Sequence, residues 1–149
     1  MNSELMFSSK KQDWETPQEL FDKLNDEFDF DTDVAASVDN AKCDIYLTEE
    51  DDALSISWND LGNIFCNPPY ESKLQNGFIK KAYEESLNTD NKIVLLIPAR
   101  TDTLRWHEYI IGKAEVRFLR GRLKFEVGGI AHKDAAPFPS AIVIYNNDK

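Results

Sequence analysis

Cysteine is scarce in this sequence, with only Cys43 and Cys66 among its 149 residues. Two cysteines form neither a disulfide framework nor a cysteine zinc site, and their scarcity favours a reducing cytoplasm. The longest apolar run, Ile93 to Pro98, is far too short to span a bilayer. Residues 1–11 lack the apolar region and cleavage site of a secretory signal. We therefore expect a cytoplasmic protein without a membrane segment.

The sequence also lacks the features that separate domains. It contains six glycines and has no Gly/Ser-rich tract, internal repeat or low-complexity segment. Residues 1–12 are polar and are expected to form a flexible N-terminus, and residues 13–149 a single domain. Because His107 and His132 have no partner at metal-ligand spacing, no metal site is predicted.

Positive charge is in the minority and is unevenly distributed. The 17 Lys and Arg residues against 27 Asp and Glu residues give a net charge of −10. Residues 1–66 hold 17 acidic and 4 basic residues, whereas residues 91–133 hold 9 basic and 4 acidic residues. Phosphate binding usually leaves a basic footprint, and only the second segment offers one. Charge alone therefore supports a solvated mixed surface and a polyanion-binding face equally.

Hydrophobic periodicity predicts strands that alternate with helices. Thr16 to Glu19 has the pattern of a capping box, with Pro17 in the first turn, and predicts the start of a helix. Its apolar stripe would be Leu20, Phe21, Leu24 and Phe28. Further helices are expected over 78–87 and 104–111, and strands over 28–34, 44–48, 63–66, 93–97, 115–119, 122–127 and 141–145.

This order of elements predicts an α/β fold with a mostly parallel sheet, flanking helices and a C-terminal antiparallel hairpin. Ligands in such sheets bind beyond the carboxyl ends of the strands. Asp33 and Asn67 both fall at such ends.

The segment Asn67-Pro68-Pro69-Tyr70 follows an apolar strand and carries the clearest chemistry. An exocyclic amine on adenine or cytosine is a poor nucleophile, because its lone pair is delocalised into the ring. The Asn67 side-chain oxygen and the Pro68 carbonyl could accept its hydrogens out of the ring plane and draw the nitrogen toward a tetrahedral shape. Two prolines hold these acceptors rigid before the substrate arrives. Tyr70 is expected to stack on a base flipped out of the duplex. The structural alternative is an ordinary Pro-Pro turn.

Asn-Pro-Pro-Tyr after an apolar strand is the catalytic signature of amino methyltransferases that act on DNA bases. Several ordered segments over residues 13–146 resemble the phage and prophage DNA N-6-adenine-methyltransferase family. They are Trp14-Glu15-Thr16-Pro17-Gln18-Glu19-Leu20-Phe21, Asp31-Thr32-Asp33-Val34-Ala35-Ala36-Ser37, Asp51-Asp52-Ala53-Leu54 with Trp58, Gly121-Arg122-Leu123-Lys124-Phe125 and Phe138-Pro139-Ser140. The resemblance implies a compact Rossmann-like methyltransferase fold, S-adenosylmethionine as cofactor, and methylation of adenine N6 in double-stranded DNA. It assigns catalysis to Asn67, Pro68, Pro69 and Tyr70, and a cofactor contact to Asn67 as well.

The resemblance also implies which residues bind the cofactor. Thr16 and Pro17 would lie against its methionine end, Asp33 and Ala35 would line its loop, and Asp52 would accept a hydrogen bond from its adenine amino group. A purely structural role remains an alternative for most of these residues. Helix capping accounts for the Thr16-Pro17 pair, a turn accounts for Asp33, and a solvated charge run accounts for Asp52.

Two departures from the family pattern concern the cofactor loop. Ala35 and Ala36 stand where many such enzymes have a Gly-x-Gly that lets the backbone approach the cofactor. Only 30 residues separate Ala36 from Asn67, which leaves little room for the usual helix and strand. The residue that binds the ribose is therefore not fixed, and Asp44 and Glu49 are candidates.

The basic segment offers contacts to DNA. Arg100, Arg122 and Lys124 are the candidates for binding phosphate or base edges, although ion pairs with the many acidic residues account for any single one equally well. The chain has no room for a separate recognition domain. Sequence choice would come from loops 71–77, 99–106 and 128–136 or from a second subunit, so a homodimer is one expectation.

Two other functions remain open. An amino methyltransferase could act on RNA adenine or on a protein glutamine, and the glutamine enzyme would not need the basic segment. A catalytically silent relative could keep the fold and bind DNA or protein, and the missing glycines make this more than a formal alternative.

Overall fold

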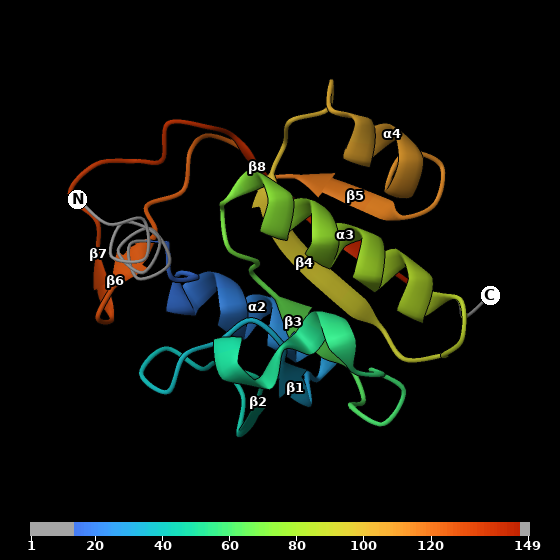
Figure 1. The fold of residues 1–149 in the computed structure, drawn as a ribbon. Helices are drawn as coiled ribbons and strands as arrows, with labels where there is room; N and C mark the ends of the chain where they lie inside the picture. The colour runs from blue at the N-terminus through green and yellow to red at the C-terminus, as the bar shows by residue number, and fades with distance from the viewer. Residues whose placement is uncertain (1–13, 147–149) are drawn as a thin grey trace.

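A six-stranded sheet in the order β2-β1-β3-β4-β8-β5 forms the centre of the protein, as the computed structural model in Figure 1 shows for residues 14–146. The expected flexible segment 1–12 lies outside the described residues. The strands are β1 (Thr32–Asp33), β2 (Ile45–Tyr46), β3 (Ile64–Cys66), β4 (Ile93–Pro98), β5 (Glu115–Phe118) and β8 (Ser140–Tyr145). Strands β2, β1, β3 and β4 pair in parallel, and β8 lies antiparallel between β4 and β5. The expected Rossmann-like α/β fold with a C-terminal antiparallel pair is confirmed.

Helices cover both faces of the sheet, so the core has two layers (Figure 1). On one face α3 (Ser72–Ser86) and α4 (Leu104–Tyr109) pack against the sheet, and on the other face α2 (Gln18–Phe28) does. Alternate residues of β4 supply the two layers, because successive side chains of a strand point to opposite faces. Ile93, Leu95 and Ile97 face α3, whereas Val94 and Leu96 face α2. All six residues of β4 are buried, which explains the continuous apolar run.

The prediction of a capping box at Thr16 is wrong. Helix α2 begins at Gln18, and the residue at its N-cap position is Pro17, which makes no side-chain cap. Thr16 is buried, and its hydroxyl accepts a hydrogen bond from the Asn67 side chain instead. The carboxylate that accepts from the Gln18 N–H belongs to Glu126, far along the chain. Tertiary partners have thus replaced the local cap.

Three expected strands are much shorter than predicted, and the one expected over 44–48 forms only as the two residues of β2. The alternating stretch 28–34 is helical at Phe28, turns at Asp29 with a φ of 50°, and pairs only at Thr32–Asp33. Of the expected strand 122–127, only β6 (Glu126–Val127) forms, and it pairs with β7 (Ile130–Ala131) in a separate two-stranded sheet. Figure 1 shows this hairpin beside the N-terminal end of α2, away from the main sheet.

The connection from β1 to β3 contains no α-helix, and the structure describes all of it. After β2 the chain makes two short 3-10 turns, η1 (Glu49–Asp51) and η2 (Ala53–Ser55), before it enters β3. The helix for which the segment between Ala36 and Asn67 was expected to leave little room is therefore absent from this connection. The loops after β1 and β3 still begin at the same edge of the sheet, because the two strands are parallel neighbours.

Candidate active site

The side chain of Asn67 has a fixed orientation at the carboxyl end of β3. Its Nδ2 donates to the Trp14 carbonyl at 2.7 Å and to the Thr16 hydroxyl oxygen at 3.1 Å. Its Oδ1 is buried and has no hydrogen-bond partner among the described residues. A buried acceptor left unpaired costs roughly 1–3 kcal/mol. The site therefore holds an acceptor that a donor from a ligand would satisfy.

Tyr70 belongs to an aromatic cluster at the end of the same loop. The cluster comprises Trp14, Tyr70, Phe125, His132 and Phe138. Trp14 stacks on Tyr70, with ring centroids 5.8 Å apart, and on His132, with centroids 5.7 Å apart. Burial raises the pKa of Tyr70, so its phenol stays protonated. One face of the Tyr70 ring thus packs on Trp14, and the cluster ties the loop to the segment around Phe125.

A hollow beside this loop collects most of the expected cofactor residues. Its volume is about 380 Å³, counting the part open to solvent. It is lined by Trp14, Glu15, Thr16, Asp33, Ala35, Asn40, Lys42, Phe65, Asn67, Pro68, Pro69 and Tyr70. Pro17 is absent from this lining. Of the ribose candidates, Asp44 lines a different depression, beside Cys43.

The loop after β1 is shaped by side-chain acceptors instead of glycines. Asp33 is buried, and its two carboxylate oxygens accept from the backbone N–H groups of Ala35 and Lys42, both at 3.1 Å. Within the loop, Asn40 accepts from the Ser37 N–H at 2.7 Å. The Ala36 N–H donates to a backbone carbonyl beyond β2. Asp33 therefore fixes the backbone of the loop that forms part of the wall of the hollow.

A second hollow of about 500 Å³, counting its open part, adjoins the first, and the two share Ala35 and Pro69. Its wall is largely apolar, with polar groups from the chain that follows β2. The lining residues are Val34, Ala35, Thr48, Glu49, Asp52, Ala53, Leu54, Pro69, Leu74 and Phe78. Asp52 is exposed, and its backbone has a φ of 50°. Together the two hollows form an elongated depression whose second part is largely apolar.

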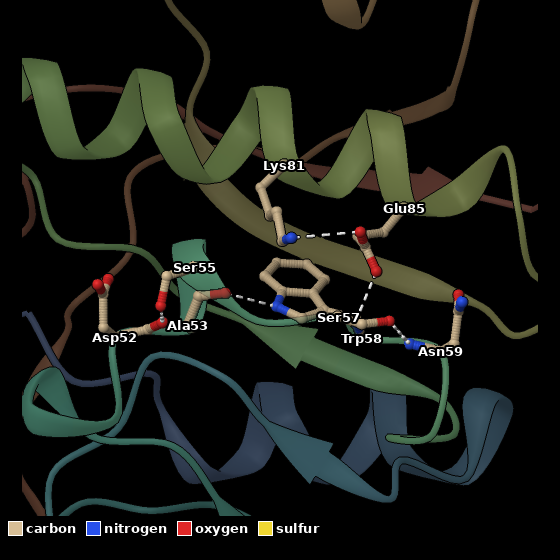
Figure 2. A network of polar contacts seen from close by, with 8 residues as sticks. All are labelled: Asp52, Ala53, Ser55, Ser57, Trp58, Asn59, Lys81 and Glu85. Carbon is tan, nitrogen blue, oxygen red and sulfur yellow. Dashed lines mark hydrogen bonds and ion pairs between the residues drawn. The ribbon is translucent and has the colours of Figure 1, made fainter.

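Trp58 anchors the segment that carries Asp52, as Figure 2 shows. Its indole is 1% exposed, and its Nε1 donates to the Ala53 carbonyl at 2.9 Å. Its backbone N–H donates to Glu85, which also forms an ion pair with Lys81 at 3.2 Å. Trp58 thus fixes the turn at Asp52 against helix α3.

The basic residues divide into paired and unpaired ones. Arg117 is held by Glu27 and Glu115, with nitrogen to oxygen distances of 2.7 Å to each. Arg100 lies over the Phe138 ring of the aromatic cluster, 5.7 Å from its centroid, and has no ion pair to another described residue. Arg122 and Lys124 are exposed, and they lead into the buried Phe125 of the same cluster. The structure therefore brings Arg100 to the site and leaves Arg122 and Lys124 on the adjoining surface.

Two contacts of Trp14 in the site could not be predicted from the sequence. Trp14 was expected only as part of a motif, whereas its ring lies at the centre of the aromatic cluster and its carbonyl accepts a hydrogen bond from Asn67. Nothing in the local sequence marks a backbone carbonyl, so no signal could have found this contact. Burial raises the pKa of the Cys66 thiol, so it is a neutral core group. Among the described residues, no group of His, Cys, Asp and Glu could hold a metal ion, and no helix is long and apolar enough to cross a membrane.

The chain matches the model of a family described as DNA N-6-adenine-methyltransferase (Dam) over residues 3–148. It is 30% identical over 117 residues to a DNA N-6-adenine-methyltransferase of Escherichia phage T1, which covers 78% of this chain and 48% of that protein. It is 41% identical over 63 residues to "Putative methyltransferase YfdM" of Escherichia coli (strain K12), covering 38% of this chain and 69% of that protein. The chain thus spans about half the length of the phage relative. Because the family model matches almost the whole sequence, the chain belongs to the DNA N-6-adenine-methyltransferase (Dam) family.

Proposed function

We propose that the protein methylates the exocyclic N6 amino group of adenine in double-stranded DNA. The buried, unpartnered Oδ1 of Asn67 carries this proposal. An adenine amine offers hydrogens to such an acceptor, and a hydrogen bond out of the ring plane makes its nitrogen more nucleophilic. The name of the phage relative supports DNA adenine as the acceptor, and it extends the proposal to a phage or prophage setting in a bacterial cytoplasm.

We propose that the adjoining hollows mark the binding site of S-adenosylmethionine, which would supply an electrophilic methyl group when bound. Thr16, Asp33 and Ala35 line the first hollow together with Asn67, and Asp52 lies at the second. The largely apolar second hollow suits the adenine end, and the first hollow, whose lining mixes polar and apolar groups, offers polar partners to the charged methionine end. Pro17 lines neither hollow, and we propose that it acts by setting the start of helix α2.

The target base would enter beside Tyr70. A base inside a duplex cannot reach a loop at the edge of a sheet, so it must rotate out of the stack. Pro68 and Pro69 are held in the wall of the first hollow and keep the loop rigid while the base enters. Stacking on Tyr70 would contribute about 1–3 kcal/mol.

A transfer assay with several acceptors tests the proposal. The protein is incubated with labelled S-adenosylmethionine and, in separate reactions, duplex DNA, RNA or protein, and the modified nucleoside is then identified. We expect label in DNA as N6-methyladenine. Label in RNA or in protein glutamine would replace the proposal with one of the other amino methyltransferases. No transfer to any acceptor and no cofactor binding by calorimetry would leave the catalytically silent relative.

Asp52→Ala is expected to raise the KM for S-adenosylmethionine by about 10-fold to 100-fold, because it removes a charged hydrogen-bond acceptor at the second hollow. The rate at saturating cofactor should change little, since Asp52 does not line the hollow that Asn67 lines. Glu50→Ala is the matched control, because Glu50 is an exposed neighbour that lines neither hollow. Equal KM values for the two variants would contradict the role of Asp52.

Charge reversal at Arg100 and Arg122 is expected to weaken DNA binding and to reduce its dependence on salt. Each lost phosphate contact should lower the slope of log K against log[salt] by about one. The Kd is measured by fluorescence anisotropy over a range of salt concentrations. Lys23→Glu reverses one charge, half of the change in the double variant, on the acidic half of the sequence, where Lys23 pairs with Glu19. If the double variant behaves like this control, neither arginine binds phosphate.

A further inference from the structure

The Asn67 amide is held by two acceptors that both lie ahead of helix α2. The Trp14 carbonyl and the Thr16 hydroxyl receive the two hydrogens of Nδ2, at 2.7 and 3.1 Å. A carbonyl oxygen can only accept, so the amide atom facing Trp14 must be the nitrogen. The oxygen is thereby forced to the other side, where it stays unpartnered.

The segment that supplies these acceptors is itself rigid. The backbone of Glu15 exchanges two hydrogen bonds with Glu126 of strand β6, at 3.0 and 2.9 Å. The Trp14 ring packs on four other rings of the aromatic cluster. Thr16 is 3% exposed, so its hydroxyl is screened from solvent. Neither acceptor can move away without breaking contacts outside the site.

We propose that Thr16 is a positioning residue for methyl transfer: its hydroxyl and the Trp14 carbonyl lock the Asn67 amide so that Oδ1 faces the target amine. The inference rests on the proposed function, because it explains how Asn67 Oδ1 is oriented to accept from the target amine. Without the Thr16 hydroxyl, only the Trp14 carbonyl would hold Nδ2, and the amide would tilt about that single hydrogen bond and turn Oδ1 away from the target amine. The lock therefore acts on the rate of transfer, through Asn67.

This role differs from a direct contact between Thr16 and the cofactor. A cofactor contact predicts that loss of the hydroxyl raises the KM for S-adenosylmethionine. The lock predicts a lower kcat at nearly unchanged KM, because the interaction that is lost matters in the transition state. The two roles thus separate in steady-state kinetics.

The first arm of the test needs no activity and uses hydrogen exchange. The side-chain amide of Asn67 is identified in the NMR spectrum of the full chain as the signal missing from Asn67→Ala. We expect both of its protons to be protected from exchange in the wild type and in Thr16→Ser, which keeps the hydroxyl. Thr16→Val, which has nearly the same shape and no hydroxyl, should lose protection of one proton. An unprotected amide in the wild type would overturn the lock.

The second arm compares kcat and KM for the same variants. Thr16→Val should lower kcat on the order of 10-fold to 100-fold, as small errors in catalytic geometry do, and Thr16→Ser should recover most of it. Thr89→Val is the matched control: it removes a threonine hydroxyl that accepts from Asn91, in the turn after helix α3. A raised cofactor KM at unchanged kcat would overturn the lock in favour of a cofactor contact. If the wild type transfers no methyl group, the proposed function fails, and the exchange arm alone supports or overturns the lock.

Discussion

Asn67→Ala is expected to lower the rate of methyl transfer to DNA by about 10²–10³-fold, the usual effect of removing one preorganised polar group from a reacting centre. The variant loses Oδ1, the side-chain acceptor that the site leaves unpaired. Single-turnover measurements with saturating cofactor and DNA isolate the step on which this group acts. The effect should appear there, because the hydrogen bond strengthens as the amine nitrogen becomes tetrahedral.

The substitution also removes the donor to the Trp14 carbonyl and to Thr16. Its fold must therefore be checked by thermal unfolding, and its affinity for the cofactor by calorimetry. Asn88→Ala is the matched control, since Asn88 is exposed after helix α3 and makes no side-chain bond to another described residue. An Asn67→Ala protein that transfers methyl groups as fast as this control would refute the mechanism.

Trp58→Ala is expected to produce the largest loss of stability, about 3–5 kcal/mol in the free energy of unfolding. The indole is 1% exposed in the core between the 3-10 turns and helix α3, so its removal leaves a large cavity. It also leaves the Ala53 carbonyl without its donor. Because Asp52 precedes that residue, the affinity for S-adenosylmethionine should fall as well. Urea unfolding and calorimetry measure the two effects.

Trp58→Phe separates packing from hydrogen bonding. It keeps an aromatic ring in the core and removes the Nε1 donor, so most of the stability should return. Leu87→Ala, at a position that is 56% exposed, serves as a control for the loss of an apolar side chain. If Trp58→Ala unfolds at the same urea concentration as Leu87→Ala, Trp58 does not anchor the turn.

Much of the fold could be predicted from the sequence, because its signals are local. Residues Ile93 to Ile97 form an uninterrupted apolar run, and they lie in the buried central strand. The Asn67 loop follows a short apolar strand and, as expected, lies at the carboxyl edge beside the loop after β1. The errors occur where a distant residue displaced a local partner. Thr16 has the right spacing for a cap, yet its hydroxyl accepts a hydrogen bond from Asn67. The first N–H of the helix donates to the Glu126 carboxylate instead.

Several residues that line the hollows could be named from the sequence, whereas their contacts could not. Asp33 and Asp52 could be named from a resemblance, and both line the hollows. That Asp33 uses both of its carboxylate oxygens on the backbone of its own loop could not be foreseen. The stretch 122–127 alternates like a strand, yet it does not join the main sheet, and its buried Phe125 packs on Trp14 and in the core layer on the α2 face. Periodicity indicates that a side chain is buried, but it does not indicate which residues pack against that side chain.

The carboxylate of Asp33 bears on how tightly and how fast a ligand can bind. A glycine-rich loop is free to adopt many shapes, and a ligand that orders it must offset the lost conformational entropy. Here the Asp33 side chain fixes the backbone at Ala35 and at Lys42 in the folded chain itself. The entropy is lost during folding, so association needs no slow rearrangement of this wall. Substituting glycines into the loop would shift that loss to the binding step, and weaker affinity would follow.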